Sequence, residues 1–148
     1  MAVKFGAREP AGLVRKVQLL RFDAGLDPVT RRGVPVQGVE SLLVHMAVRP
    51  AHVRSWREVV EWLGDLVVEA VEDDVLLELE DRPRTVRVRL AYLLQGLWPD
   101  VSERIGGEAT TKVWFGPGRT LRRRGQRWGF ADSVLPFDPA VLPRVRGR

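Results

Sequence analysis

The sequence contains no cysteine and only two histidines. The lack of cysteine excludes disulfide bonds, thiol catalysis and every metal site built on thiolates. No run of 18 apolar residues occurs, and the first residues lack the apolar core of a secretion signal, so no membrane partner is expected. We therefore expect a cytoplasmic protein.

The residue patterns of common active sites are also missing. No G-x-S-x-G motif surrounds a serine, and the glycines at Gly116 and Gly118 lack the spacing and the lysine of a phosphate-binding loop. His45 and His52 are separated by Pro50, which should end a helix before the second histidine, so the two side chains are not expected to share a metal ion. The sequence thus predicts no enzyme, no metal and no cofactor.

Charge is distributed unevenly along the chain. Residues 1–108 carry a net charge of −2 and residues 109–148 a net charge of +7, and the segment 58–81 has ten acidic residues without a lysine or arginine. The acidic residues of this segment lack the spacing of a calcium loop, which favours a solvated acidic face. Such separation of sign predicts either internal pairing of the two regions or two faces for different partners.

The length and composition favour one compact domain. Hydrophobic residues make up 45% of the chain and charged residues 29%, which is within the range of globular proteins. We expect a single domain over residues 1–148, with flexible ends at 1–12 and 137–148. Residues 14–22 are rich in β-branched side chains and predict a strand, which would pair with a second strand at 33–37 in a hairpin.

Three amphipathic helices are predicted in the middle of the chain, at residues 39–49, 55–71 and 85–97. Ser55 and Glu58 have the spacing of a capping box, and Thr85 could cap the third helix. Pro50 should end the first helix and Pro99 the third. The stretch between the second and third helices, residues 72–84, predicts either a short helix or a strand-like link.

Two short strands follow, at residues 111–115 and 128–130, joined by an arginine-rich connection of about a dozen residues. Prolines near the end of the chain predict an extended, unpaired tail. The predicted fold is therefore α+β, with a small helical core of three main helices, an N-terminal β-hairpin and a C-terminal Arg-rich β-hairpin.

The arginine-rich connection is the candidate functional site. Guanidinium groups bind phosphates and also carboxylates, so either a nucleic acid or an acidic protein surface would suit them, and a solvated loop is the third alternative. The flanking tryptophans could stack on bases, anchor a protein partner or close the hairpin over the core. The predicted contact set consists of Arg119, Arg122, Arg123, Arg124, Arg127, Trp114 and Trp128. The other tryptophans, Trp56, Trp62 and Trp98, are predicted to pack in the interior.

Several segments together resemble the C-terminal domain of the AbiEi family, the antitoxins of type IV toxin–antitoxin systems, across residues 14–139. A V-x-V strand leads to an acidic residue that begins a leucine-rich helix, a later helix carries an R-L-x-Y-L-L run, and an arginine-rich turn precedes a tryptophan. These features fall on Val34, Val36, Glu40, Leu42, Leu43, on Arg89, Leu90, Ala91, Tyr92, Leu93, Leu94, and on Arg122, Arg123, Arg124 and Trp128. The chain departs from the family after Glu40, where it reads SLLVHM and the family usually has a threonine and an aspartate.

The resemblance implies a non-enzymatic, antitoxin-like regulator from bacterial phage defence. Such antitoxins repress their own operon through an N-terminal winged helix-turn-helix that binds DNA, and they counteract a nucleotidyltransferase-like toxin. Only 13 residues precede the first predicted strand, so we expect the antitoxin-type domain to stand alone. The alternatives are a stand-alone module that binds DNA or RNA through the basic C-terminal loop, and a structural subunit of a nucleoprotein assembly.

Overall fold

The computed structural model of the chain describes residues 24–107, 112–116, 120–125, 128 and 130–148. Its fold is α+β, as predicted. The elements in chain order are β1 (Val29–Arg31), β2 (Val34–Val36), α1 (Val39–Val48), the 3-10 turn η1 (Pro50–His52), α2 (Trp56–Glu69), α3 (Glu72–Leu79), α4 (Arg84–Leu94), α5 (Pro99–Gly106), β3 (Val113–Phe115), β4 (Arg123–Arg124), β5 (Phe130–Asp132) and the 3-10 turn η2 (Pro139–Val141).

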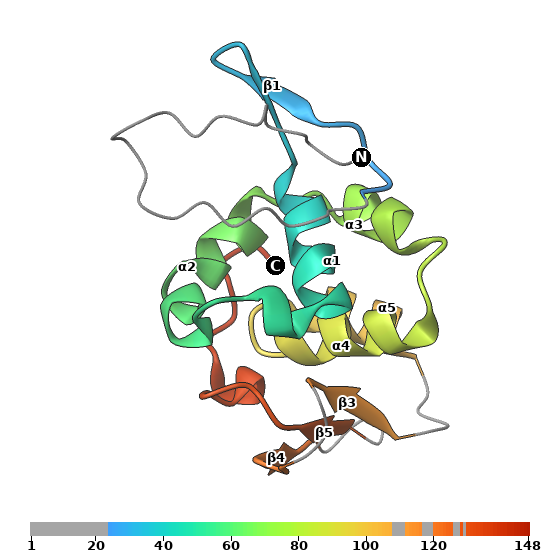
Figure 1. Cartoon of the computed structure of the whole chain (residues 1–148), viewed down its shortest axis with the longest axis vertical. Coiled ribbons are helices and arrows are strands. Elements are labelled where there is room, and N and C mark those ends of the chain that lie inside the picture. The colour runs from blue at the N-terminus through green and yellow to red at the C-terminus, as the bar shows by residue number, and fades with distance from the viewer. Residues whose placement is uncertain (1–23, 108–111, 117–119, 126–127, 129) are drawn as a thin grey trace, which may run out of the picture.

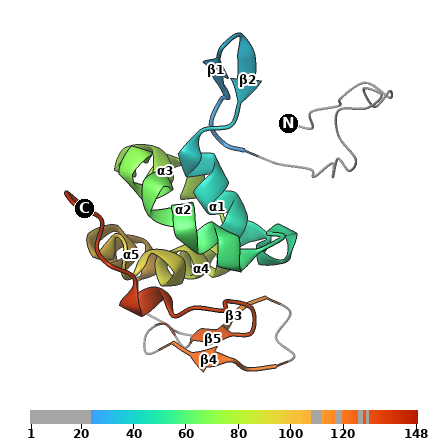
Figure 2. The ribbon, with the colours of Figure 1, turned by 90° about the vertical axis from the view of Figure 1, so that its left-hand side faces the viewer.

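The helices form the central layer of the molecule (Figures 1 and 2). The β1–β2 hairpin projects from one end of this layer, and the three-stranded sheet β3–β5–β4 lies at the opposite end. Helix α4 is central, since it packs against α1, α5 and β3. Its side chains are buried on nearly all sides from Leu90 to Leu94, because helices cover one flank and the sheet the other.

The predicted helix boundaries are largely confirmed. The Ser55 hydroxyl accepts the backbone N–H of Glu58 at 3.3 Å, which caps α2, and α1 ends at Val48, before Pro50. The link after α2 is helical, the first of its two alternatives. The expected cap at Thr85 is wrong, because α4 already begins at Arg84, immediately after a proline.

Pro99 begins a helix instead of ending one. Helix α4 stops at Leu94, and α5 starts at Pro99, where the missing N–H costs nothing because the first turn has no acceptor for it. The sequence prediction took the apolar residues up to Leu97 as part of one longer helix. Helix α5 was therefore missed.

Two buried carboxylates hold the helices and the N-terminal segment together. Glu40 of α1 accepts the N–H of Val71 at 2.8 Å, at the start of α3. Glu78 of α3 accepts the N–H groups of Gly25 and Leu26 at 2.8 and 2.9 Å. The acidic segment is thus not wholly a solvated face, because Glu78 points inward.

The N-terminal hairpin is present, and the strand predicted at residues 33–37 is confirmed as β2, but its partner in the hairpin is β1. Strands β1 and β2 are antiparallel, with Val29 opposite Val36. They are joined at Arg32 and Gly33, whose φ angles of 50° and 78° suit a two-residue hairpin turn. The strand predicted at residues 14–22 lies outside the described residues.

A C-terminal hairpin that carries arginines is also present. It is formed by β4 and β5, which are antiparallel, with Arg123 opposite Asp132. The first and last strands do pair directly, but the expected hairpin between them is wrong, since β3 runs parallel to β5. The chain reverses twice between these strands because the arginine-rich connection itself contributes β4.

The end of the chain is packed against the helices, contrary to the unpaired tail that its prolines predict. The backbone N–H of Val145 donates to the carbonyl of Leu97 at 2.9 Å. The Arg148 guanidinium lies 4.5 Å from the centre of the Trp98 ring, a cation–π contact. In the described residues, no helix has both the length and the apolar character needed to cross a membrane.

Candidate functional site

Arg123 is turned into the protein by its position on β4. Its Nη1 lies 3.2 Å from Oδ2 of Asp132 and donates to the carbonyl of Phe137 at 2.6 Å. Asp138 also lies within 3.7 Å of its Nε. Because these groups already use the guanidinium, Arg123 serves the internal structure of the sheet.

Asp132 is the acceptor around which this end of the sheet is built. The residue is 0% exposed, and its Oδ1 accepts the N–H groups of Val134 and Leu135 at 2.9 Å. Its Oδ2 accepts the hydroxyl of Tyr92 at 3.0 Å. Burial, and then the charge of Asp132, raise the pKa of Tyr92, so the phenol stays protonated and donates. Every oxygen of the buried carboxylate therefore has a partner.

Arg122, which immediately precedes β4, and Arg124, which is on it, both lie toward solvent. Successive side chains of a strand point to opposite faces, so these two residues face away from the side that Arg123 occupies. Both are exposed; the guanidinium of Arg122 makes only a 3.4 Å contact to the carbonyl of Val134, and the guanidinium of Arg124 makes no hydrogen bond or ion pair within the described residues. Their guanidinium groups are available to a partner. The predicted contact residues Arg119 and Arg127 lie outside the described residues.

The two flanking tryptophans differ in exposure. Trp128 is 6% exposed, and its indole N–H donates to the carbonyl of Gly107 at 2.8 Å. It therefore closes the sheet over the helical core, one of the alternatives left open by the sequence. Trp114 is half-buried, with the ammonium of Lys112 4.6 Å from its ring centre. Of the two rings, Trp114 is the one that a partner can reach.

The run at residues 89–94 joins the helices to the sheet. The Nε of Arg89 donates to the carbonyl of Trp114 at 2.7 Å, and its Nη1 to the carbonyl of Ala47 at 3.3 Å. Burial lowers the pKa of Arg89. The helix that carries this run was predicted from the sequence, but the structural role of Arg89 was not. An arginine on the otherwise apolar face shared with Tyr92 is the signal that could have revealed it.

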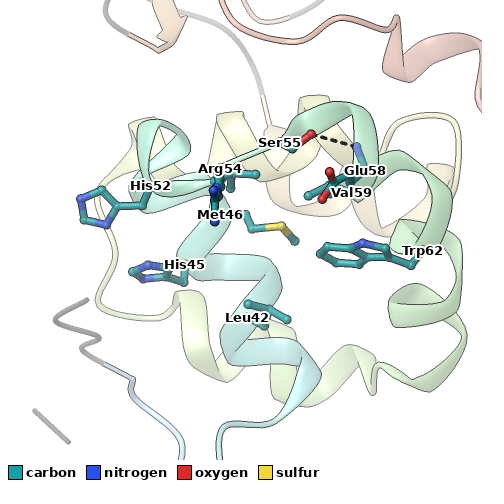
Figure 3. A pocket seen from close by; sticks show the side chains of 10 residues that line it. Leu42, His45, Met46, His52, Arg54, Ser55, Glu58, Val59 and Trp62 are labelled. Carbon is teal, nitrogen blue, oxygen red and sulfur yellow. Dashed lines mark hydrogen bonds between the residues drawn. The ribbon is translucent and has the colours of Figure 1, made fainter. Parts of the chain in front are cut away.

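A separate pocket of about 280 Å³ opens between α1, η1 and α2 (Figure 3). Trp62 lies on one side of it and two histidines on the other. The rings of His45 and His52 are 5.9 Å apart, because η1 folds the chain back beside α1. Pro50 ends the helix between them, as predicted, but it does not keep the two rings apart. Within the described part of the chain, no three His, Cys, Asp or Glu side chains gather as a metal site would require.

Trp62 was predicted to pack in the interior, and this is wrong. Its side chain is 38% exposed, whereas Trp56 and Trp98 are buried as predicted. The buried face of α2 is made by Val59 and Leu63, and Trp62 lies beside that face and not within it.

The described residues therefore form a small α+β domain. Charged side chains such as those of Arg122 and Arg124 are exposed on its surface. Residues 1–96 match the AbiEi antitoxin C-terminal domain, and the chain belongs to this family. The match ends before β3. The family correspondence of Arg122, Arg123, Arg124 and Trp128 therefore stays a prediction.

The fold is also similar to that in the crystal structure of the Rv2827c protein from Mycobacterium tuberculosis. The two chains share 25% sequence identity with a TM-score of 0.60, and the similarity covers 70% of this chain and 37% of that one. The chain thus corresponds to little more than a third of that protein. Among curated proteins, none matches the chain significantly.

Proposed function

We propose that the chain is an antitoxin-type regulatory domain that acts by binding its partners and not by catalysis. The family match supports the antitoxin role. The polar cluster around the buried Asp132 is used to hold the sheet together, whereas Arg122 and Arg124 are exposed, and this supports a role in binding. The toxin we expect it to counteract is nucleotidyltransferase-like, as in the resemblance noted from the sequence.

The proposed contact surface for nucleic acid is the outer side of β4 together with Trp114 on β3. Strand β5 lies between these two strands, and Trp114 and Arg124 are both in register with its Ala131. The observation that carries this part of the proposal is the division of three adjacent arginines, in which Arg123 is held internally and Arg122 and Arg124 are left exposed. Exposed guanidinium groups bind phosphate oxygens and release counterions, and an accessible indole can stack on an unpaired base.

The antitoxin role can be tested by co-expression. The reading frame next to that of this chain should encode a nucleotidyltransferase-like protein that arrests bacterial growth when expressed alone. Co-expression of this chain should restore growth, and the two proteins should co-purify or the toxin should be inactivated. Growth arrest that persists despite soluble expression of this chain would contradict the role.

A stand-alone nucleic-acid-binding module is the second candidate, because the exposed arginines would suit it without any toxin. The two candidates differ in one outcome. A module of this kind should bind nucleic acid with steep salt dependence and should leave the toxin's effect on growth unchanged.

A further inference from the structure

One face of the sheet β3–β5–β4 is turned away from the helical core. Val113 and Phe115 of β3 are 5% and 0% exposed and point inward, so Trp114 between them points outward. Ala131 and Arg124 are level with Trp114 on the other two strands, so the three side chains form one row across this outer face. The row therefore has an aromatic ring at one end and a guanidinium group at the other, with only a methyl group between them.

The spacing of this row suits one nucleotide and the phosphates beside it. Neighbouring strands lie about 4.8 Å apart, so β3 and β4 are separated by about 10 Å. This separation is comparable with the distance from a base to its neighbouring phosphates, and the length of an arginine side chain covers the difference. Arg122 lies two residues before Arg124, about 7 Å along the chain, where it can reach the next phosphate.

The charge of the outer face favours a polyanion. Between residues 109 and 134 the sequence has one acid, Asp132, whose carboxylate is 0% exposed and already bonded to Arg123. Lys112, Arg122 and Arg124 are all exposed. Phosphates that approach this face therefore meet three cations and no exposed carboxylate of the same segment.

The ring of Trp114 has a face that a base can occupy. The ammonium of Lys112 lies over it, 4.6 Å from the ring centre. A cation–π contact of an exposed lysine is weaker than the stacking of a base on an aromatic ring, so a base can displace the ammonium, which then stays close enough to pair with a phosphate. The backbone beneath the ring is held in place, because the carbonyl of Trp114 accepts the Nε–H of Arg89 at 2.7 Å.

We propose that the outer face of this sheet binds unpaired nucleotides, with one base stacked on Trp114 and the adjoining phosphates on Arg124 and Arg122. This inference rests on the proposed function and names the kind of nucleic acid that uses the whole of its contact surface. In a duplex the faces of each base are covered by the neighbouring bases, so only the phosphate contacts remain. A single strand, a loop or an overhang offers both contacts, and RNA and DNA share this chemistry.

The first test removes the ring. A fluorescein-labelled DNA oligonucleotide of unstructured sequence is titrated alone and annealed to its complement, with fluorescence anisotropy as the readout. Trp114→Ala should lower the affinity for the single strand by about tenfold, the effect of one lost base stack, and leave the affinity for the duplex unchanged. Trp114→Phe should restore most of the loss, because it keeps an aromatic ring. Trp62→Ala is the matched control, since that indole is 38% exposed on α2, away from the sheet.

The second test separates the ring from the cations by salt. Stacking releases no counterion, so Trp114→Ala should keep the wild-type slope of log affinity against log salt for the single strand. Arg122→Ala/Arg124→Ala should make that slope shallower by about 1.4, or about 0.7 for each lost phosphate contact. The same titrations with RNA of the same sequence show which of the two nucleic acids the face binds more tightly.

A third readout uses the intact wild-type protein. In 5-fluorotryptophan-labelled protein, Trp114→Phe assigns one of the five tryptophan resonances. Addition of the single strand should shift the Trp114 resonance and leave that of the buried Trp98 unchanged, whereas the duplex should shift the Trp114 resonance less. This measurement decides the question even if Trp114→Ala fails to fold.

The outcomes separate this inference from the function on which it rests. If neither the single strand nor the duplex binds at low salt, the nucleic-acid part of the proposed function fails. If both bind and Arg122→Ala/Arg124→Ala flattens the salt slope, but Trp114→Ala binds the single strand as tightly as wild type, the contact surface stands and the stacked base is wrong. A Trp114 resonance that does not move at saturating single strand, or an equal loss of duplex affinity in Trp114→Ala, would also overturn the inference.

Discussion

At the scale of single residues, position on a strand decides what identical side chains do. Arg122, Arg123 and Arg124 are chemically the same, yet only Arg123 reaches Asp132. The basic segment was predictable from the sequence, and all of its arginines were predicted as contacts. The sequence could not separate them, because a run of arginines has no alternation of polar and apolar residues from which a strand and its inward face are recognised.

Because Arg123 is bonded internally and Arg124 is not, replacing each with alanine should change the stability by different amounts. Arg123→Ala should lower the free energy of unfolding by about 2 kcal/mol, because it removes a charge-assisted hydrogen bond from the buried Asp132. Arg124→Ala should change it by less than about 0.5 kcal/mol, since that side chain makes no internal bond among the described residues. Urea denaturation of the two variants measures the difference. Equal losses of unfolding free energy in the two variants would show that Arg123 is not held internally any more than Arg124 is.

At the scale of elements, the amphipathic helices were predictable and their connections less so. Ser55 gave a clear start signal, and the apolar periodicity of α2 is strong, whereas α1 is apolar on most of its sides. Proline was ambiguous, because it ends one helix and begins the next equally well, and α5 was missed for that reason. The packing of the tail was also hidden, since it depends on contacts with the ends of α2 and α4 that are distant in sequence.

The packed tail can be tested with two glycines. A Cβ added at Gly96 would lie 2.3 Å from the carbonyl oxygen of Pro139, whereas one at Gly64 would meet nothing nearer than 4.0 Å, at Val145. Gly96→Ala should therefore destabilise the protein by about 1–3 kcal/mol, through overpacking. Gly64→Ala should stabilise it by about 0.5–1 kcal/mol, as alanine favours a helix interior. Thermal unfolding reports both, and a neutral Gly96→Ala would mean that the tail does not pack there.

At the scale of the whole molecule, the charge pattern in the sequence becomes two separate surfaces. The sequence established that acids and arginines are segregated, but not whether they face each other. Burial and pairing decide this: Glu78 is used internally, while the carboxylates of α2 and the guanidinium groups of Arg122 and Arg124 remain exposed. Opposite charges at different places on one small domain suit it to hold two partners at once.

The most direct test of the account is the salt dependence of nucleic-acid binding. The affinity for a mixed-sequence DNA duplex is measured between about 50 and 200 mM salt for the wild type, for Arg122→Ala/Arg124→Ala and for Arg57→Ala, an exposed arginine of α2. The slope of log affinity against log salt should be shallower by about 1.8 in the double variant, as expected for two lost phosphate contacts, and unchanged in Arg57→Ala. No binding at low salt, or the same slope in all three proteins, would contradict the proposed contact surface.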